Sequence, residues 1–142
     1  MGDGPQNRPM SKGYLLDTCA WLDLNIAPEL LSNEARAIIR RTDYFAFSSI
    51  SILEVSRKVS LGKLALSLSL EDWLAIALPS RRIRQLTITP EIAIETYRLP
   101  DEFHPDPADR IIVATARRNQ LTLLTSDQRI LEYSHVKSIS SR

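Results

Sequence analysis

The sequence YLLDTCAW at residues 14–21 is the stretch that best predicts the fold. Three residues that favour a strand lead directly into the carboxylate of Asp17, and an apolar segment typical of a helix follows. This order predicts a buried strand whose carboxyl end presents Asp17 beside the start of a helix. In open α/β sheets, the carboxyl ends of the strands form the edge at which ligands bind. Asp17 is therefore the first candidate functional residue.

Length and composition predict one globular domain. The chain has 142 residues, of which 44% are hydrophobic and 25% charged, as in ordinary globular proteins. We expect a single domain over residues 13–142. The polar, Gly- and Pro-containing residues 1–12 are expected to form a flexible leader rather than a secretory signal. The net charge is only +1, so any nucleic-acid partner would have to be held by local clusters of Lys and Arg.

The cysteine and histidine counts exclude several classes of site. Cys19 is the only cysteine, which excludes an intrachain disulfide and a thiolate zinc cluster and suits a reducing, cytoplasmic compartment. The only two histidines, His104 and His135, argue against a histidine-rich metal site. No apolar run approaches the ~18 residues of a membrane-spanning helix, so we expect no membrane partner.

Short strands alternate with helices along the chain, which predicts an α/β fold with a mainly parallel sheet. We expect strands at residues 14–17, 45–49, 84–88, 121–125 and 136–139. We expect helices at residues 19–25, 32–41, 51–61, 70–78, 90–98, 106–119 and 126–133. Ser51 and Glu54 have the spacing of a capping box, which would start the third of these helices at Ser51.

Three further carboxylates, on Glu54, Asp109 and Asp127, accompany Asp17. Each has a structural explanation: Asp17 could cap a helix, Glu54 could complete the capping box or pair with Lys58, and Asp127 could stabilise a turn. Asp109 is the most informative of them. It shares a helix face with apolar residues 112, 113 and 116, and a buried carboxylate needs a partner or a metal.

Taken together, the four carboxylates predict a metal site. In right-handed β-α-β units the ends of strands and the starts of helices lie at the same edge of the sheet. Asp17 and Asp127 follow strands, whereas Glu54 and Asp109 lie near helix starts. Clustered carboxylates raise one another's pKa values unless a cation is present. Oxygen ligands favour Mg²⁺ or Mn²⁺, and such an ion could polarise a phosphoryl oxygen and activate water.

At this point the chain resembles PIN-domain proteins, specifically the VapC-type toxins of toxin–antitoxin pairs. The resemblance covers residues 14–139. It rests on LLDT (15–18), SISILEV (49–55), KVSLGKL (58–64), HPDPADR followed by IIVATA (104–116), and LLTSD (123–127). The segment HPDPADR is the most specific of these motifs.

The resemblance implies a fold and an activity. The fold would be a three-layer α/β/α sandwich around a five-stranded sheet of order 3-2-1-4-5, which makes the first and fourth strands neighbours. The activity would be that of an endoribonuclease dependent on Mg²⁺ or Mn²⁺. The resemblance assigns catalysis and metal binding to Asp17, Glu54, Asp109 and Asp127. Residues expected to support the site are Thr18, Ser126, Asp106 and Arg110.

The resemblance also implies partners. These are an RNA substrate such as tRNA, rRNA or mRNA, a VapB-like antitoxin that lies across the active edge, and a second copy in a homodimer. Basic side chains near the acidic edge are candidates for guiding RNA, although each could equally be solvated surface: Arg57, Lys58, Lys63, Arg81, Arg82, Arg84 and Arg110. Leucines that could serve an interface or the core are Leu30, Leu31, Leu64, Leu66, Leu68 and Leu70.

Two other functions remain open. A PIN fold without activity could work as a binding module, which need not bind Mn²⁺. A phosphohydrolase of the haloacid-dehalogenase type also places an Asp at the end of its first strand. That chemistry requires a second Asp two residues later, where this chain has Cys19.

Overall fold

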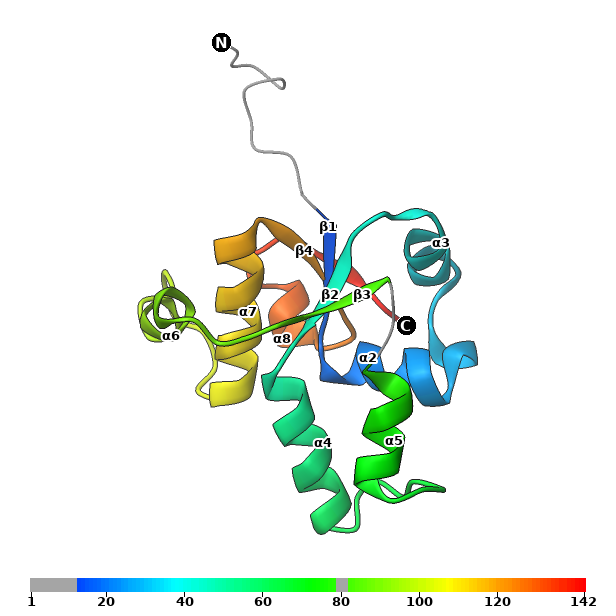
Figure 1. The fold of residues 1–142 in the computed structure, drawn as a ribbon. Helices are drawn as coiled ribbons and strands as arrows, with labels where there is room; N and C mark the ends of the chain where they lie inside the picture. Colours follow the sequence, from blue (N-terminus) through cyan, green and yellow to red (C-terminus); the bar gives the residue numbers. More distant parts are fainter. Residues whose placement is uncertain (1–12, 79–81) are drawn as a thin grey trace.

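A five-stranded parallel sheet forms the centre of the molecule (Figure 1). The computed structural model describes residues 13–78 and 82–142, so the expected leader at residues 1–12 lies outside the described residues. The strand order β3-β2-β1-β4-β5 is the one predicted, and every pair is parallel. The strands are β1 (Gly13–Leu16), β2 (Phe45–Ser48), β3 (Ile83–Leu86), β4 (Leu121–Thr125) and β5 (Ser138–Ser140).

Helices cover both faces of the sheet, which confirms the predicted three layers. The helices are α2 (Thr18–Ile26), α3 (Asn33–Arg41), α4 (Ile50–Ser60), α5 (Leu70–Ala77), α6 (Pro90–Thr96), α7 (Pro107–Asn119) and α8 (Gln128–Leu131), with a 3-10 turn at Pro28–Leu30. In Figure 1, α6 and α7 lie on one side of the sheet and α3 and α5 on the other. Helix α4 extends from the end of β2 and lies beside α5.

Each face of the sheet has its own hydrophobic core. Leu15 packs with buried residues of α6 and α7, whereas its neighbour Leu16 packs with residues of α2, α3 and α5. Side chains alternate between the two faces of a strand, so a strand covered on both sides is apolar throughout. On the α2 side, Trp21 stacks on Phe47 with ring centroids 4.3 Å apart, and Trp73 meets Trp21 edge-on. This aromatic packing holds the start of α2, and hence Asp17, against the end of β1.

Most predicted helix starts are confirmed. The side chains of Ser32, Ser69, Thr89 and Asp106 accept hydrogen bonds from backbone N–H groups at the starts of α3, α5, α6 and α7. Gly62 has a φ of +71°, a conformation that glycine adopts without strain, and it follows Leu61, the C-cap residue of α4.

The predicted capping box of α4 is wrong. The helix begins one residue earlier than predicted, at Ile50, and the N-cap Ser49 makes no side-chain cap. Ser51 lies inside the helix and is fully buried, and its hydroxyl is 2.8 Å from that of Thr18. Because β2 ends at Ser48, whose hydroxyl accepts from the backbone N–H of Ile50, the helix starts before Ser51.

The six leucines considered for an interface divide between core and surface. Leu31 is buried, and Leu64, Leu66 and Leu70 pack against the α2-side core. Leu30 and Leu68 are 47% and 43% exposed. Packing inside the monomer therefore accounts for four of the six. Within residues 13–78 and 82–142, every helix is too short or too polar to cross a membrane.

Candidate metal centre

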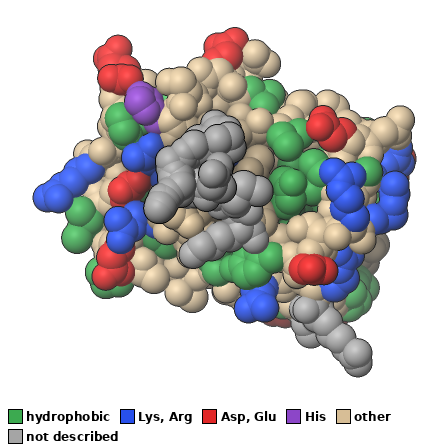
Figure 2. Space-filling view, turned by 90° about the horizontal axis from the view of Figure 1, so that it is seen from above, with side chains coloured by type: hydrophobic (Ala, Val, Ile, Leu, Met, Phe, Trp, Pro, Cys, Tyr) green, Lys and Arg blue, Asp and Glu red, His purple; other side chains and the backbone are tan. Residues whose placement is uncertain are grey.

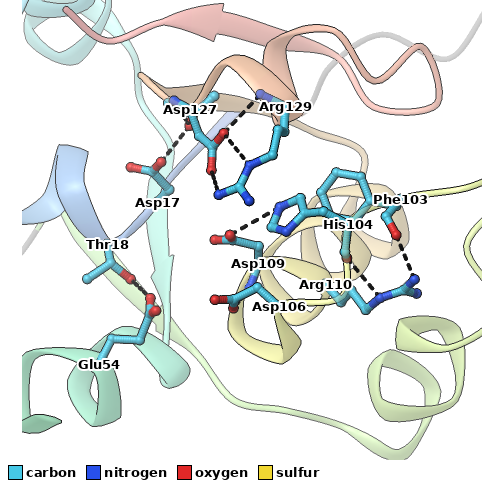
Figure 3. A network of polar contacts seen from close by, with 11 residues as sticks. Asp17, Thr18, Glu54, Phe103, His104, Asp106, Asp109, Arg110, Asp127 and Arg129 are labelled. Carbon is cyan, nitrogen blue, oxygen red and sulfur yellow. Dashed lines mark hydrogen bonds and ion pairs between the residues drawn. The ribbon is translucent and has the colours of Figure 1, made fainter.

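The four predicted carboxylates lie around the carboxyl edge of β1 and β4. These two strands are paired with Leu16 opposite Leu124, so they end at the same level. Asp17 follows β1 directly, and its backbone N–H donates to the carbonyl of Leu124 over 3.1 Å. Asp127 follows β4 by one residue, at the start of α8. Figure 3 shows Glu54 and Asp109 approaching the same space from α4 and α7.

Asp17 is buried and held by two hydrogen bonds. Only 6% of the residue is exposed. Its Oδ1 accepts from the backbone N–H of Ala20 over 2.8 Å, and its Oδ2 accepts from the hydroxyl of Thr125 over 2.5 Å. Asp17 therefore caps α2 as well as facing the cluster. Burial raises its pKa to about 6, and the charges of Asp127 and Glu54 act in the same direction.

Glu54 is held by the residue that follows Asp17. The hydroxyl of Thr18 donates to Glu54 Oε1 and also contacts the hydroxyl of Ser51. Thr18 is only 5% exposed, so this contact fixes the carboxylate of Glu54 from a rigid position. The sequence suggested Ser51 as a helix cap. Its side chain instead contacts the hydroxyl of Thr18, which holds Glu54.

Asp109 has the most perturbed carboxylate of the cluster. It lies in the first turn of α7 with its side chain 19% exposed, and Ile112, Val113 and Ala116 on the same helix are buried, as predicted. Burial raises the pKa of Asp109 to about 7, with further contributions from the charges of Asp106, Glu54, Asp127 and Asp17. Asp106 caps α7 by accepting from the backbone N–H of Asp109 over 3.1 Å.

Asp127 differs from the other acids because an arginine neutralises it. Its carboxylate accepts from the backbone N–H of Arg129 and pairs with the guanidinium of the same residue at 3.2 Å. Burial acts to raise the pKa of Asp127, but these hydrogen bonds outweigh burial and lower it. Ser126, the predicted supporting residue, precedes Asp127 and is partly buried.

One residue at the centre was not predicted from the sequence. One ligand atom from each of His104, Asp109 and Asp127 lies within 4.8 Å of the others, so these three residues could hold a metal ion. The imidazole Nε2 of His104 is 3.2 Å from Oδ2 of Asp109 (Figure 3). The only sequence signal was the position of His104 two residues before Asp106, in the segment HPDPADR that leads into α7. The presence of only two histidines argued against a histidine-rich site and gave no indication of a single histidine at the centre.

The side chain of Arg110 contacts backbone carbonyls, which is not the role expected from the sequence. It was expected to support the site and was a candidate for guiding RNA. Instead, its guanidinium donates to three backbone carbonyls, those of Thr96, Phe103 and His104, and stacks over the ring of Tyr97. The guanidinium therefore fixes the segment between α6 and α7, in which His104 lies.

The basic residues considered for RNA contact do not all lie near the carboxylates. Arg57 and Lys58 follow Glu54 by about one turn of α4, and Lys63 follows the end of that helix. Arg82 and Arg84 lie at the start of β3. The amino ends of the parallel strands are on the side of the sheet opposite to the carboxylates. Arg82 donates to the carbonyls of residues 39 and 42, and Arg84 lies over the ring of residue 44. Arg81 lies outside the described residues.

The surface at the amino ends of the strands carries both positively and negatively charged side chains. Figure 2 views the molecule from the side of the amino ends of the strands. On this face, Lys and Arg side chains are interspersed with Asp, Glu and hydrophobic side chains. The described part of this face shows no continuous stripe of basic side chains.

The donor atoms at the carboxyl edge suit a divalent cation. Without a cation, the carboxylates of Asp17 and Asp109 have raised pKa values, because burial and neighbouring negative charges disfavour their ionised forms. A divalent ion bound to carboxylate oxygens would remove that penalty. Asp17 and Glu54 lie outside the tight group of His104, Asp109 and Asp127, although their charges act on Asp109.

Comparison with known proteins assigns the family. The model of the PIN domain family matches residues 14–136. Ribonuclease VapC22 from Mycobacterium tuberculosis is 30% identical over 129 residues, which cover 87% of this chain and 98% of that protein.

Solved structures share the fold. One is VapBC2 from Rickettsia felis bound to a promoter DNA fragment, with a TM-score of 0.67 and 16% identity over 91% of this chain and 98% of that chain. Another is the sarcin-ricin loop cleaving toxin VapC20 from M. tuberculosis, with a TM-score of 0.62 and 14% identity over 88% of this chain and 99% of that chain. From its match to the family model and its identity to VapC22, the chain belongs to the PIN-domain family.

Proposed function

We propose that this protein is a metal-dependent endoribonuclease of the VapC type that hydrolyses RNA phosphodiester bonds. One observation carries the proposal: Asp17, Glu54, Asp109 and Asp127 meet at the carboxyl edge of the sheet, where burial and mutual repulsion raise the pKa values of Asp17 and Asp109. The relationship to ribonuclease VapC22 supports RNA as the substrate class.

The roles of the side chains follow from their surroundings. A bound Mg²⁺ or Mn²⁺ would polarise the scissile phosphate and provide an activated water. We assign Asp17, Glu54, Asp109 and Asp127 to holding the ion and orienting water around it. Thr18 orients Glu54 through its hydroxyl, and Thr125 orients Asp17 in the same way.

We assign the supporting residues Asp106, Arg110 and Ser126 to fixing the backbone around the site. Asp106 fixes the start of α7 by capping it, and Arg110 fixes the segment that precedes α7. Ser126 is the one residue between the end of β4 and Asp127. We assign these three residues to positioning the carboxylates rather than to contact with RNA.

RNA binding is assigned to α4 and the loop after it. Arg57, Lys58 and Lys63 lie along or just beyond the helix that carries Glu54, so they can contact phosphates that flank a scissile bond at the carboxylates. Arg82 and Arg84 serve as matched controls because they lie at the amino ends of the strands, on the side of the sheet opposite to the carboxylates. Replacing Arg57 and Lys58 with Ala should weaken RNA binding and reduce its salt dependence, whereas the Arg84→Ala change should not.

The proposed partners follow from the same family membership. Several solved structures of this fold are toxin–antitoxin complexes, including one from Klebsiella pneumoniae. We propose that a VapB-like antitoxin neutralises this protein by covering its acidic edge, and that the toxin forms a homodimer. We place the activity in the cytoplasm, where its cellular RNA substrates are found.

RNA cleavage by the purified, antitoxin-free protein tests the proposal. Structured tRNA and rRNA fragments would be incubated with Mg²⁺ or Mn²⁺, with EDTA, and with the Asp109→Asn variant. Discrete cleavage that requires metal and is lost in the variant supports the proposal. Equal cleavage by the variant contradicts the assigned site. Absence of both cleavage and Mn²⁺ binding would favour the inactive binding module.

A further inference from the structure

The imidazole of His104 is a buried polar group without a hydrogen-bond partner. Its side chain is only 9% exposed, and neither ring nitrogen makes a hydrogen bond within the described residues. Nε2 approaches Asp109 Oδ2 to 3.2 Å, which is close enough for an ion pair but lacks hydrogen-bond geometry. Buried polar groups are nearly always paired, because leaving one unpaired is unfavourable. A buried ring nitrogen without a protein partner is available to bind a ligand.

The segment that carries His104 is fixed by contacts on several sides. Arg110 donates to the carbonyl of His104 over 3.1 Å and to that of Phe103 over 2.9 Å. The hydroxyl of Tyr133 donates to the carbonyl of Pro100 over 2.5 Å, and the rings of Phe103 and His104 lie 4.4 Å apart. The direction of the imidazole is thus set by the fold.

The distances fit two ligands of one ion. Ligand atoms bound at about 2.1 Å and at right angles around a divalent ion lie about 3 Å from each other. The separation of 3.2 Å between His104 Nε2 and Asp109 Oδ2 matches this value. The third member, Asp127, completes a group whose ligand atoms all lie within 4.8 Å. Atoms on opposite sides of such an ion would be about 4.2 Å apart, so a small contraction suffices.

We propose that His104 is a direct nitrogen ligand of the divalent metal at this centre, together with Asp109 and Asp127. The inference rests on the proposed function, since it concerns the same ion. It changes the expected chemistry of the site from an all-oxygen set to a mixed nitrogen and oxygen set. Imidazole binds Mn²⁺ and later transition metals better than it binds Mg²⁺, which prefers oxygen and retains its waters.

Metal selectivity therefore depends on His104. In the His104→Gln variant we expect Mn²⁺ to bind at least about tenfold more weakly, since changes even to residues behind a ligand cost that much. The affinity for Mg²⁺ should change much less. The matched control is His135→Gln, because His135 is the only other histidine and pairs with Asp101 over 2.7 Å outside the centre.

Pulsed electron paramagnetic resonance of bound Mn²⁺ tests the ligand directly. A protein free of any histidine tag would be prepared at natural abundance and with ¹⁵N-labelled histidine. We expect a nitrogen coupling that changes from ¹⁴N to ¹⁵N on labelling and persists in the His135→Gln variant. This comparison does not require the His104 variant to fold. Where that variant does fold, it should bind Mn²⁺ without the coupling.

The other outcomes overturn the inference in distinguishable ways. Bound Mn²⁺ without a histidine nitrogen coupling, in a protein that still cleaves RNA with metal, would leave the proposed function standing and remove His104 from the ligands. A coupling lost in the His135→Gln variant would place the ion elsewhere. A protein that binds no Mn²⁺ would overturn both this inference and the proposed function.

Discussion

Replacing Asp109 with Asn should stabilise the metal-free protein, even though it removes a candidate metal ligand. In the metal-free structure, burial and four neighbouring carboxylates raise the pKa of Asp109 from 3.8 to about 7. The folded state therefore binds this proton more tightly than the unfolded chain does. It follows that Asp109 contributes a destabilisation that is absent below about pH 4 and grows as the pH rises to about 7.

The size of the effect follows from the two pKa values. A change from 3.8 to about 7 corresponds to about 4 kcal/mol of folding free energy above pH 7. Asn has nearly the same shape as Asp but carries no charge, so the Asp109→Asn variant should gain about 2–4 kcal/mol at pH 8 and almost nothing at pH 4. Saturating Mn²⁺ should reverse the order, because the ion stabilises the wild-type protein by binding its folded state.

Urea denaturation in EDTA between pH 4.5 and pH 8 measures this difference. The control is Asp43→Asn, the same chemical change at an exposed position in the loop before β2. Its stability relative to the wild type should not change across this pH range. A gain for Asp109→Asn that is independent of pH, or a loss of stability at pH 8, would refute the electrostatic reasoning.

Three further changes test other parts of the account. Thr18→Val should slow RNA cleavage by about tenfold with little loss of stability, because it removes the hydroxyl that orients Glu54, and Thr18→Ser should retain most of the rate. Arg110→Ala should lower the free energy of unfolding by about 2–4 kcal/mol in urea, because three carbonyls lose a charged donor, and Lys should restore only part of it. Phe47→Ala should cost about 3–5 kcal/mol and weaken the near-ultraviolet circular dichroism of Trp21, whereas Phe47→Leu should cost far less; equal losses would contradict the stacking.

The position of Asp17 and Asp127 at one edge of the sheet could be predicted from short sequence patterns, whereas the order of the strands was implied only by the resemblance to PIN-domain proteins. The apolar residues of β1 and β4, each followed closely by an Asp, require both acids to lie at the same edge of a parallel sheet. The start of α7 was equally predictable, because Asp106 followed by Pro is a strong signal for a helix start.

Other features depended on contacts that are distant in sequence. Ser51 has the spacing of a cap but lies inside α4, because the end of β2 determines where that helix begins. Arg110 donates to carbonyls up to 14 residues away, which no local pattern predicts. His104 joins Asp127 only because α7 and β4 bring them together, so its place at the centre could be found only in the folded chain.

The most direct test is a crystal soaked in Mn²⁺ and measured at the manganese absorption edge. The account predicts an anomalous peak at the carboxyl edge of β1 and β4, within bonding distance of Asp109 and Asp127, which is lost in the Asp109→Asn variant. A fully occupied Mn²⁺ site elsewhere, or a peak that persists unchanged in the variant, would contradict the claim that these carboxylates form the metal centre.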